Sequence, residues 1–304
     1  MNNALLTLPL PTHFSFKECL WFLDRNFDEC LYRVKEGGVE RIIDVDGHPL
    51  LVRITGDEQQ LSIHSLDGAF TARSRKVVSD YVTHWFDLKR DLAPFYQLLQ
   101  QDKRLAYMVQ DFEGLRLMGI PDVYEALCWC IIGQQINLPF AYKLKRRLVE
   151  GYGISMQHNG TTYHQLPAYE TLAQISTADF KAMQFSTSKG QYLVNVARAF
   201  ADGQLSLAQL EALPDMTARQ QLLTSIKGIG TWSANYVLMK CLRDGAAIPF
   251  GDSGLNAALL SHGIISDKKD TQGILRFFKP FAGWESYLVF YLWRSLSKVT
   301  VPGK

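Results

Sequence analysis

The stretch LLTSIKGIGTWSANYVLMKCL, residues Leu222–Leu242, contains two helical patterns joined by a Gly-Ile-Gly turn. The first pattern ends at Lys227 and the second begins near Thr231. Gly228 and Gly230 permit positive φ angles and a close approach of the backbone to another chain. The first amides of the second helix have no partner within it, so they form a seat for a phosphate beside the positive charge of Lys227. An ordinary helical hairpin with a glycine turn explains the same pattern.

The loop IPFGD, residues Ile248–Asp252, follows the second helical pattern. Asp252 stands immediately before SGL, where another helix is expected to begin, and an aspartate there is suited to cap that helix. A carboxylate also stabilises positive charge that develops in a reaction, and it orients or deprotonates a water molecule. The residues alone leave both roles open, and one carboxylate is able to fill both.

Together, KGIGTWSANY (Lys227–Tyr236) and IPFGD resemble the helix-hairpin-helix motif and the essential aspartate of the base-excision DNA glycosylases. Three further segments resemble the 3-methyladenine glycosylase II branch of that superfamily: IIGQQ ending at Gln135, SKGQ at residues 188–191 and WESY at residues 284–287. The resemblance covers residues 86–296 and extends more weakly to the amino-terminal part. It implies an enzyme that binds double-stranded DNA and removes alkylated purines, such as 3-methyladenine and 7-methylguanine.

The resemblance also implies roles for single residues. Asp252 would be the catalytic carboxylate, and Gln135 would fill the gap that a flipped-out nucleotide leaves in the duplex. Aromatic rings suit a cationic alkylated base through stacking and cation–π attraction, and the base pocket is assigned to Trp232, Tyr236 and Trp284. The contacts to DNA are assigned to the hairpin residues Lys227, Gly228, Gly230 and Thr231.

The cofactors that the resemblance implies are few. Main-chain carbonyls at Thr224, Ile226 and Ile229 match the positions that hold a monovalent cation, Na⁺ or K⁺, in the family. The iron–sulfur branch needs four closely spaced cysteines near the carboxy terminus. Because no cysteine follows Cys241, no cluster is expected.

The residue at the start of the second hairpin helix bears on the type of reaction. Relatives that also cut the strand carry a Schiff-base lysine where this chain has Trp232. Lys227 and Lys240 lie outside that position, so the resemblance implies a monofunctional enzyme that leaves an abasic site. Two alternatives stay open: a helix-hairpin-helix protein that binds lesions without catalysis, and an oxidised-purine glycosylase. A well-placed Asp252 argues against the first alternative, and Trp232 argues against the second.

The remainder of the chain divides into two regimes. Residues 29–66 show short runs rich in Val, Ile and Leu with Gly-Gly, Asp-Gly and Gly-Asp turns, which predicts an antiparallel meander. A helix over residues 75–88 is expected to pack on that sheet and to complete an α+β domain over residues 1–90. Residues 91–304 are helical almost without exception. The predicted fold is therefore an α+β domain followed by a mostly helical glycosylase region.

The family fold divides this helical region into two lobes with the substrate cleft between them. Here the central lobe would span about residues 114–244, and the second would combine residues 91–113 with 245–304. The basic run KLKRR (Lys143–Arg147) follows the Gln135 loop, and it either contacts phosphates or forms a solvated helix face.

The composition bounds the class of protein. The chain has 304 residues, 47% of them hydrophobic, and a net charge of +2. These values exclude global disorder and permit nucleic acid as a partner without indicating it. The sequence shows neither a long apolar span nor a signal peptide, and its five scattered cysteines favour reduced thiols. We therefore expect a monomer in the cytoplasm, associated with the nucleoid through DNA.

Overall fold

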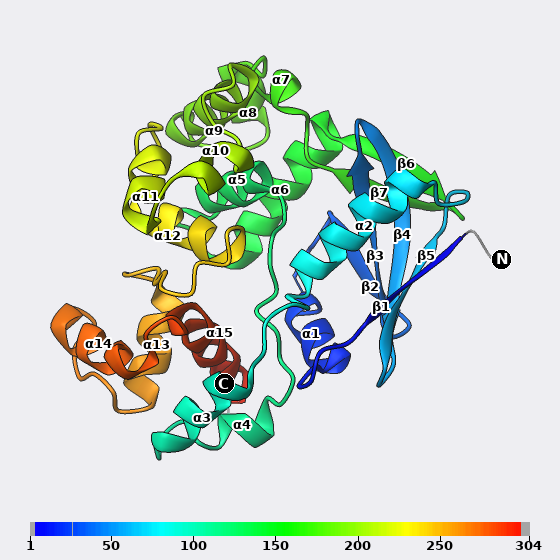
Figure 1. The fold of residues 1–304 in the computed structure, drawn as a ribbon. Helices are drawn as coiled ribbons and strands as arrows, with labels where there is room; N and C mark the ends of the chain where they lie inside the picture. Colours follow the sequence, from blue (N-terminus) through cyan, green and yellow to red (C-terminus); the bar gives the residue numbers. More distant parts are fainter. Residues whose placement is uncertain (1–3, 26, 299–304) are drawn as a thin grey trace, which may run out of the picture.

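The computed structural model describes residues 4–25 and 27–298. Its amino-terminal part is a five-stranded antiparallel sheet in the order β1-β5-β4-β3-β2 (Figure 1). The sequence-predicted meander is confirmed, and Asp46-Gly47 forms its tight turn with positive φ at both residues. The strands are β1 (Leu5–Pro9), β2 (Tyr32–Lys35), β3 (Gly38–Val45), β4 (His48–Gly56) and β5 (Gln60–Ser65).

Two helices accompany this sheet. Helix α2 (Ala72–Trp85) packs across β1 and β3 and buries Val78, Val82 and Trp85, as the helical spacing predicts. Helix α1 (Phe16–Leu23) and strand β1 were not expected from the sequence. Strand β1 ends at Pro9, whereas α1 carries a helical signal in Ser15 at its N-cap and in the i, i+3 and i+7 spacing of Phe16, Cys19 and Leu23.

The rest of the chain is mainly helical, so the predicted fold class is confirmed. The first helices are α3 (Ala93–Gln101), α4 (Met108–Asp111), α5 (Val123–Gly133), α6 (Leu138–Tyr152), α7 (Tyr169–Leu172), α8 (Thr177–Ala182), α9 (Thr187–Ala201) and α10 (Leu207–Ala212). They are followed by α11 (Met216–Thr224), α12 (Thr231–Lys240), α13 (Ser253–Ser261), α14 (Thr271–Phe278), η1 (Lys279–Phe281), α15 (Glu285–Ser295) and η2 (Leu296–Lys298).

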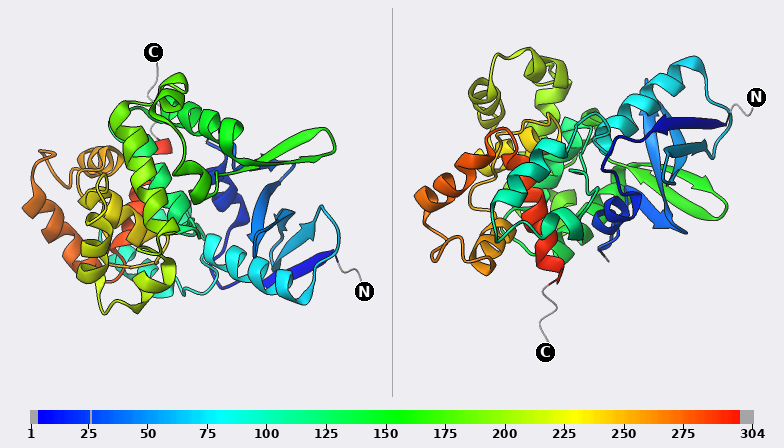
Figure 2. Two further views of the ribbon diagram at one scale, coloured as in Figure 1. Left: turned by 90° about the horizontal axis from the view of Figure 1, so that it is seen from above. Right: turned by 60° about the horizontal axis from the view of Figure 1, so that its bottom comes forward.

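A β-hairpin interrupts this helical region, contrary to the sequence-based expectation. Strands β6 (Ile154–His158) and β7 (Thr161–Gln165) turn at Asn159-Gly160, both with positive φ. Strand β7 packs near β3, and the Tyr163 hydroxyl donates to Glu40 Oε2 at 2.6 Å. The hairpin therefore connects the central helices to the amino-terminal sheet (Figure 2).

The helices nearest the two ends of the helical region pack together. Helices α3 and α4 lie beside α15 in Figures 1 and 2, although they are far apart in the sequence. The Phe95 and Tyr291 ring centroids are 5.0 Å apart, and the Tyr96 and Tyr291 hydroxyls are 3.1 Å apart. Within residues 4–25 and 27–298, no helix is both long and apolar enough to cross a membrane.

Candidate active site

The helix-hairpin-helix turn is formed by the segment between α11 and α12. Gly228 has φ +112°, and a Cβ atom there would lie 2.4 Å from the Tyr192 ring, so the turn requires glycine. Gly230 caps α12 without a side-chain hydrogen bond, and Thr231 at the start of the helix is exposed. The first N–H groups of α12 therefore point outward from an exposed helix end, which suits binding of a phosphate.

Hydrogen bonds from neighbouring helices hold this turn in place. Asn195 Nδ2 on α9 donates to Lys227 O at 3.1 Å, and Gln134 Nε2 donates to Gly228 O at 3.0 Å. Gln134 ends α5, and the next residue, Gln135, is exposed with φ +56°. The structure thus separates the two glutamines: Gln134 joins two loops, and Gln135 leaves its side chain exposed at the tip of one of them.

Asp252 occupies the N-cap position of α13. Its Oδ1 accepts a hydrogen bond from Leu255 N at 2.7 Å and another from Trp293 Nε1 at 2.9 Å. Among the described residues, no hydrogen-bond donor contacts its Oδ2. One oxygen therefore fixes the carboxylate, and the other keeps its acceptor capacity for a substrate or a water molecule.

A row of three aromatic rings leads to this carboxylate. Trp232 and Tyr236 stack with ring centroids 5.3 Å apart at 24°, as expected for positions i and i+4 of a helix. The Tyr236 ring centroid lies 6.4 Å from that of Trp293, whose indole N–H donates to Asp252. The aromatic row of Trp232, Tyr236 and Trp293 and the Asp252 carboxylate are therefore one assembly.

The structure corrects the assignment of Trp284 to the base pocket. Trp284 stacks on Phe95 at 5.5 Å and meets the Tyr287 ring edge-on at 5.6 Å, and the Arg90 guanidinium lies over it. None of its ring contacts involves the aromatic row, because Trp284 precedes α15 and Trp293 lies near the end of that helix. Trp293 was not predicted, since its relation to Asp252 exists only in the folded chain.

The basic run KLKRR is also corrected. Lys145 is 6% exposed and its Nζ lies 2.6 Å from Glu29 Oε1, while Arg146 pairs with Asp28 at 2.6 Å. Arg147 donates to Met183 O at 3.3 Å. Lys145, Arg146 and Arg147 therefore join α6 to neighbouring segments, while Lys143 is exposed, so the run is not a fully solvated face.

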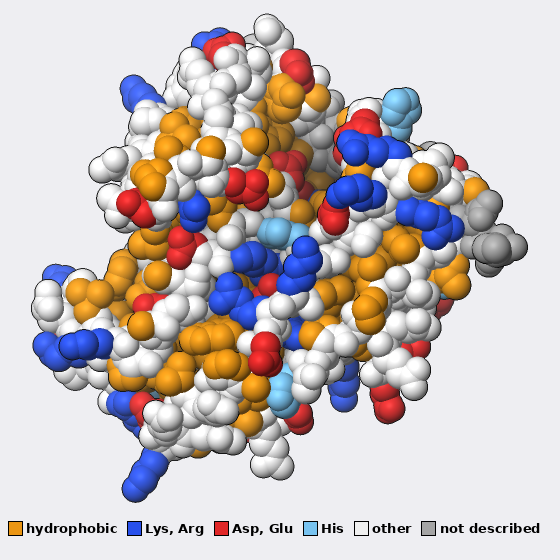
Figure 3. Space-filling model, viewed as in Figure 1, with side chains coloured by type: hydrophobic (Ala, Val, Ile, Leu, Met, Phe, Trp, Pro, Cys, Tyr) orange, Lys and Arg blue, Asp and Glu red, His pale blue; other side chains and the backbone are white. Residues whose placement is uncertain are grey.

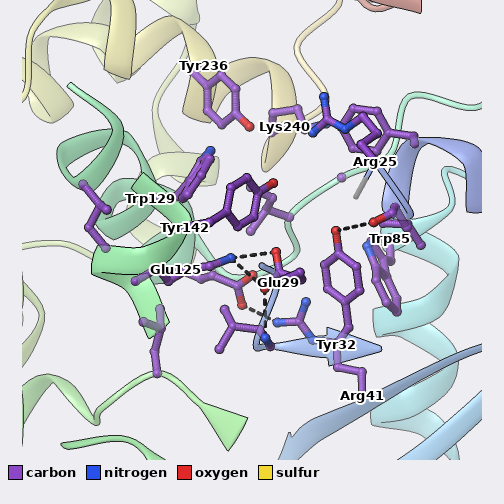
Figure 4. Close-up of a pocket in the computed structure, with 18 residues that line it drawn as sticks. Arg25, Glu29, Tyr32, Arg41, Trp85, Glu125, Trp129, Tyr142, Tyr236 and Lys240 are labelled. Atoms are coloured by element: carbon purple, nitrogen blue, oxygen red, sulfur yellow. Dashed lines mark hydrogen bonds and ion pairs between the residues drawn. The ribbon is translucent and has the colours of Figure 1, made fainter. Parts of the chain in front are cut away.

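A cavity of about 70 Å³ adjoins Tyr236, the middle ring of the aromatic row (Figure 4). Tyr236 forms part of its wall, together with residues from α1, β2, β3, α2, α5 and α6. Two ion pairs lie in its lining, Lys145–Glu29 and Arg41–Glu125. Further aromatic and cationic members of the lining are Phe22, Arg25, Tyr32, Trp85, Trp129, Tyr142 and Lys240.

The hairpin is also where a cation is predicted. Ile226 O accepts a hydrogen bond from Ile229 N at 3.0 Å, and the Thr224 hydroxyl turns back to Gln220 O at 2.9 Å. The cation at the Thr224, Ile226 and Ile229 carbonyls stays a prediction. No group of three His, Cys, Asp or Glu side chains suited to a metal occurs in the described parts of the chain.

Comparison with known proteins agrees with this geometry. The family model for the HhH-GPD superfamily of base excision DNA repair proteins matches residues 128–282, about half of the chain. The chain belongs to this superfamily. The model for the 8-oxoguanine DNA glycosylase N-terminal domain matches residues 15–127, and the family prediction made from the hairpin and Asp252 is confirmed.

Relatives cover the chain from end to end. A DNA-3-methyladenine glycosylase of Bacillus subtilis (strain 168) is 36% identical over 97% of this chain and 98% of its own length. The structure of a 3-methyladenine DNA glycosylase from Archaeoglobus fulgidus has a TM-score of 0.84 at 21% identity, covering 97% of this chain and 99% of that one. A Clostridium acetobutylicum 8-oxoguanine glycosylase/lyase in complex with double-stranded DNA has a TM-score of 0.76 at 17% identity, with coverage of 97% and 99%.

Proposed function

We propose that this protein is a monofunctional DNA glycosylase that removes alkylated purines from double-stranded DNA. The observation that carries this proposal is the Asp252 carboxylate, held by Trp293 and by the start of α13 at the end of the aromatic row. Its homologue in Bacillus subtilis is named as a DNA-3-methyladenine glycosylase, which supports the same activity.

The reaction follows from these groups. The hairpin amides and Lys227 bind a phosphate, and Gln135 takes the space of the flipped nucleotide. As the bond between C1′ and the purine nitrogen breaks, its electron pair goes to the base, which leaves a cationic alkylated purine neutral. Asp252 stabilises the positive charge at C1′. A water molecule then bonds to C1′ and loses a proton to the carboxylate or to solvent.

The proposal of a monofunctional enzyme rests on the first turn of α12. Trp232 offers no amine there, and Lys240 on the same helix face lies eight residues further on, about 12 Å along the axis. We expect an intact strand containing an abasic site. A covalent complex trapped with borohydride, or strand cutting without added base or heat, would contradict this part of the proposal.

One chain supplies every part of this site. The hairpin, the Gln135 loop, the aromatic row and Asp252 all come from α5 to α15. On the face in Figure 3, the surface is hollowed between the helices at the top and the sheet domain. A monomer is therefore sufficient for the activity, and a Na⁺ or K⁺ ion at the hairpin carbonyls belongs to the same proposal.

The direct test is release of free bases from methylated duplex DNA, separated by chromatography. We expect 3-methyladenine and 7-methylguanine in the released fraction. If the enzyme binds the DNA but releases no base, the non-catalytic alternative is correct. Release of 8-oxoguanine alone would favour the oxidised-purine alternative.

A further inference from the structure

Lys240 has a buried amine without a hydrogen-bond partner. The residue is 1% exposed, and its Nζ has no hydrogen bond among the described residues. It lies between the rings of Phe22 and Phe290, 4.6 and 4.8 Å from their centroids. Burial of an unsatisfied amine is unfavourable for folding, so its presence requires an explanation.

The place of Lys240 connects it to the active site. Trp232, Tyr236 and Lys240 are spaced i, i+4 and i+8, so they follow one face of α12 from the hairpin inward. Tyr236 and Lys240 both line the cavity, where Figure 4 shows them next to each other. Phe290 gives a second connection, because its ring centroid lies 6.3 Å from that of Trp293.

The two carboxylates of the cavity lining are already paired. Glu29 is paired with Lys145, and Glu125 is paired with Arg41. Neither carboxylate forms an ion pair with Lys240, whose near neighbours are aromatic rings. The cavity therefore offers a ligand flat apolar walls and two unpaired N–H donors, Arg41 Nε and Lys240 Nζ, which suit a planar base with an acceptor on its edge. Only Lys240 shares a helix face with the aromatic row.

We propose that Lys240 is a specificity-determining residue, which donates a hydrogen bond to a carbonyl oxygen on the inner edge of the flipped base. This inference rests on the proposed function. It assigns to the enzyme a preference for 6-oxopurines, such as alkylated guanine and hypoxanthine. Adenine-type bases carry a 6-amino donor in place of that oxygen, so the hydrogen bond from Lys240 to the 6-position is lost when they bind.

The charge state of Lys240 agrees with cationic substrates. Burial, followed by the nearby Arg243 and Arg25, lowers the pKa of Lys240 well below its usual value. A neutral amine keeps two N–H donors and does not repel a positively charged alkylated base.

The test compares two cationic lesions, so that substrate charge is constant. Release of 7-methylguanine and of 3-methyladenine from methylated duplex DNA is followed with the wild type and Lys240→Met. We expect Lys240→Met to lower the 7-methylguanine rate at least about 10-fold relative to the 3-methyladenine rate. Lys89→Met, at an exposed lysine, is the control and leaves both rates unchanged. Lys240→Gln keeps an N–H donor and restores part of the preference.

The outcomes separate this inference from the proposed function. If Lys240→Met changes both rates equally while methylated DNA still loses alkylated purines, the role of Lys240 is wrong and the function stands. If the wild type releases no base from any substrate, both proposals fail.

A second measurement removes dependence on the folding of the variant. Free hypoxanthine is expected to raise the Tm of the wild type more than free adenine does, and equal shifts would overturn the role of Lys240. We also expect Lys240→Met to unfold at a higher temperature than the wild type, because the unpaired amine is gone.

Discussion

Helix α15 contacts two aspartates, and the difference between them indicates what a catalytic carboxylate requires. Tyr287, early in the helix, donates its hydroxyl to Asp87, which is 7% exposed and lies 3.9 Å from Arg90. Trp293, near the end of the helix, donates to Asp252, which is partly exposed and retains an oxygen without a donor. Both carboxylates are held through one oxygen, so exposure separates them. The buried Asp87 suits a structural role, whereas the partly exposed Asp252 keeps its second oxygen within reach of a substrate.

The largest expected effect separates the two carboxylates. Asp252→Asn removes the charge that stabilises C1′, so we expect base release to fall at least about 100-fold with little change in DNA binding. Asp87→Asn weakens a buried network and lowers the free energy of unfolding by about 1–3 kcal/mol, with excision per folded molecule retained. In both variants, single-turnover excision measures base release and urea unfolding measures the free energy of unfolding. Near-normal base release by Asp252→Asn would exclude it as the catalytic residue.

A histidine near Asp87, His84, predicts how the free energy of unfolding depends on pH. Burial, and then the neighbouring Arg243, lowers the pKa of His84 from 6.5 to about 4. Because the unfolded chain binds this proton at higher pH, the stabilisation is complete above about pH 6.5 and is lost as the pH falls to about 4. The whole change is about 3 kcal/mol.

His84→Gln tests this pH dependence while keeping a donor for Cys241 O. Asp122, whose pKa burial raises to about 6, titrates in both proteins, so the difference between them reports His84. We expect the variant to lose less stability than the wild type between pH 6.5 and 4 in urea unfolding. Parallel pH profiles of the two proteins would show that the His84 imidazole has the same pKa in the folded and unfolded states.

The aromatic row lies next to Asp252, and substitutions in it test whether the base binds there. Trp232→Ala and Tyr236→Ala each remove a ring that stacks on the flipped base, and we expect a loss of about 1–3 kcal/mol in transition-state stabilisation. The loss is larger for 7-methylguanine than for neutral hypoxanthine, since cation–π attraction is lost as well. Single-turnover rates on both lesions, with circular dichroism to verify folding, decide this. If both folded variants keep wild-type rates, these rings are core packing and the base binds elsewhere.

Part of this site could be predicted from the sequence, and the reason is physical. Trp232 and Tyr236 share one helix face and Asp252 stands at a helix start, so residue type and spacing predict where they lie, while their roles come from the family resemblance and stay proposals. Trp293 is 41 residues from Asp252, and only the packing of α15 against α13 brings them together. Lys145 shows the reverse case, since its basic neighbours indicate a surface while the fold pairs it with Glu29.

Secondary structure shows the same division. Helical spacing gave α2, and turn residues gave the meander of β2 to β5. The hairpin of β6 and β7 carries a comparable signal in Asn159-Gly160, which precedes the β-branched pair Thr161-Thr162. The helical patterns on both sides of the segment are stronger than this turn signal, so the hairpin was not predicted. Strand β1 is different, since it depends on pairing with β5, more than fifty residues away.

The smallest expected effect concerns the two tryptophans of α15 and completes the comparison. Trp293→Phe keeps an aromatic ring near Tyr236 but removes the N–H donor of Asp252 Oδ1. A hydrogen bond to a charged group contributes about 1.5–3 kcal/mol, and the α13 cap still holds the carboxylate, so we expect about a 10-fold slower excision. Trp284→Phe preserves stacking on Phe95 and has no contact with Asp252, so its excision rate is expected to equal that of the wild type. Single-turnover rates at saturating enzyme measure both variants, and a Kd for lesion DNA separates slower chemistry from weaker binding. Because Trp293→Phe preserves most of the aromatic area, a normal Kd with a slower step would show that the indole N–H orients Asp252. Equal rates for the two variants would instead show that the α13 N-terminus alone fixes the carboxylate.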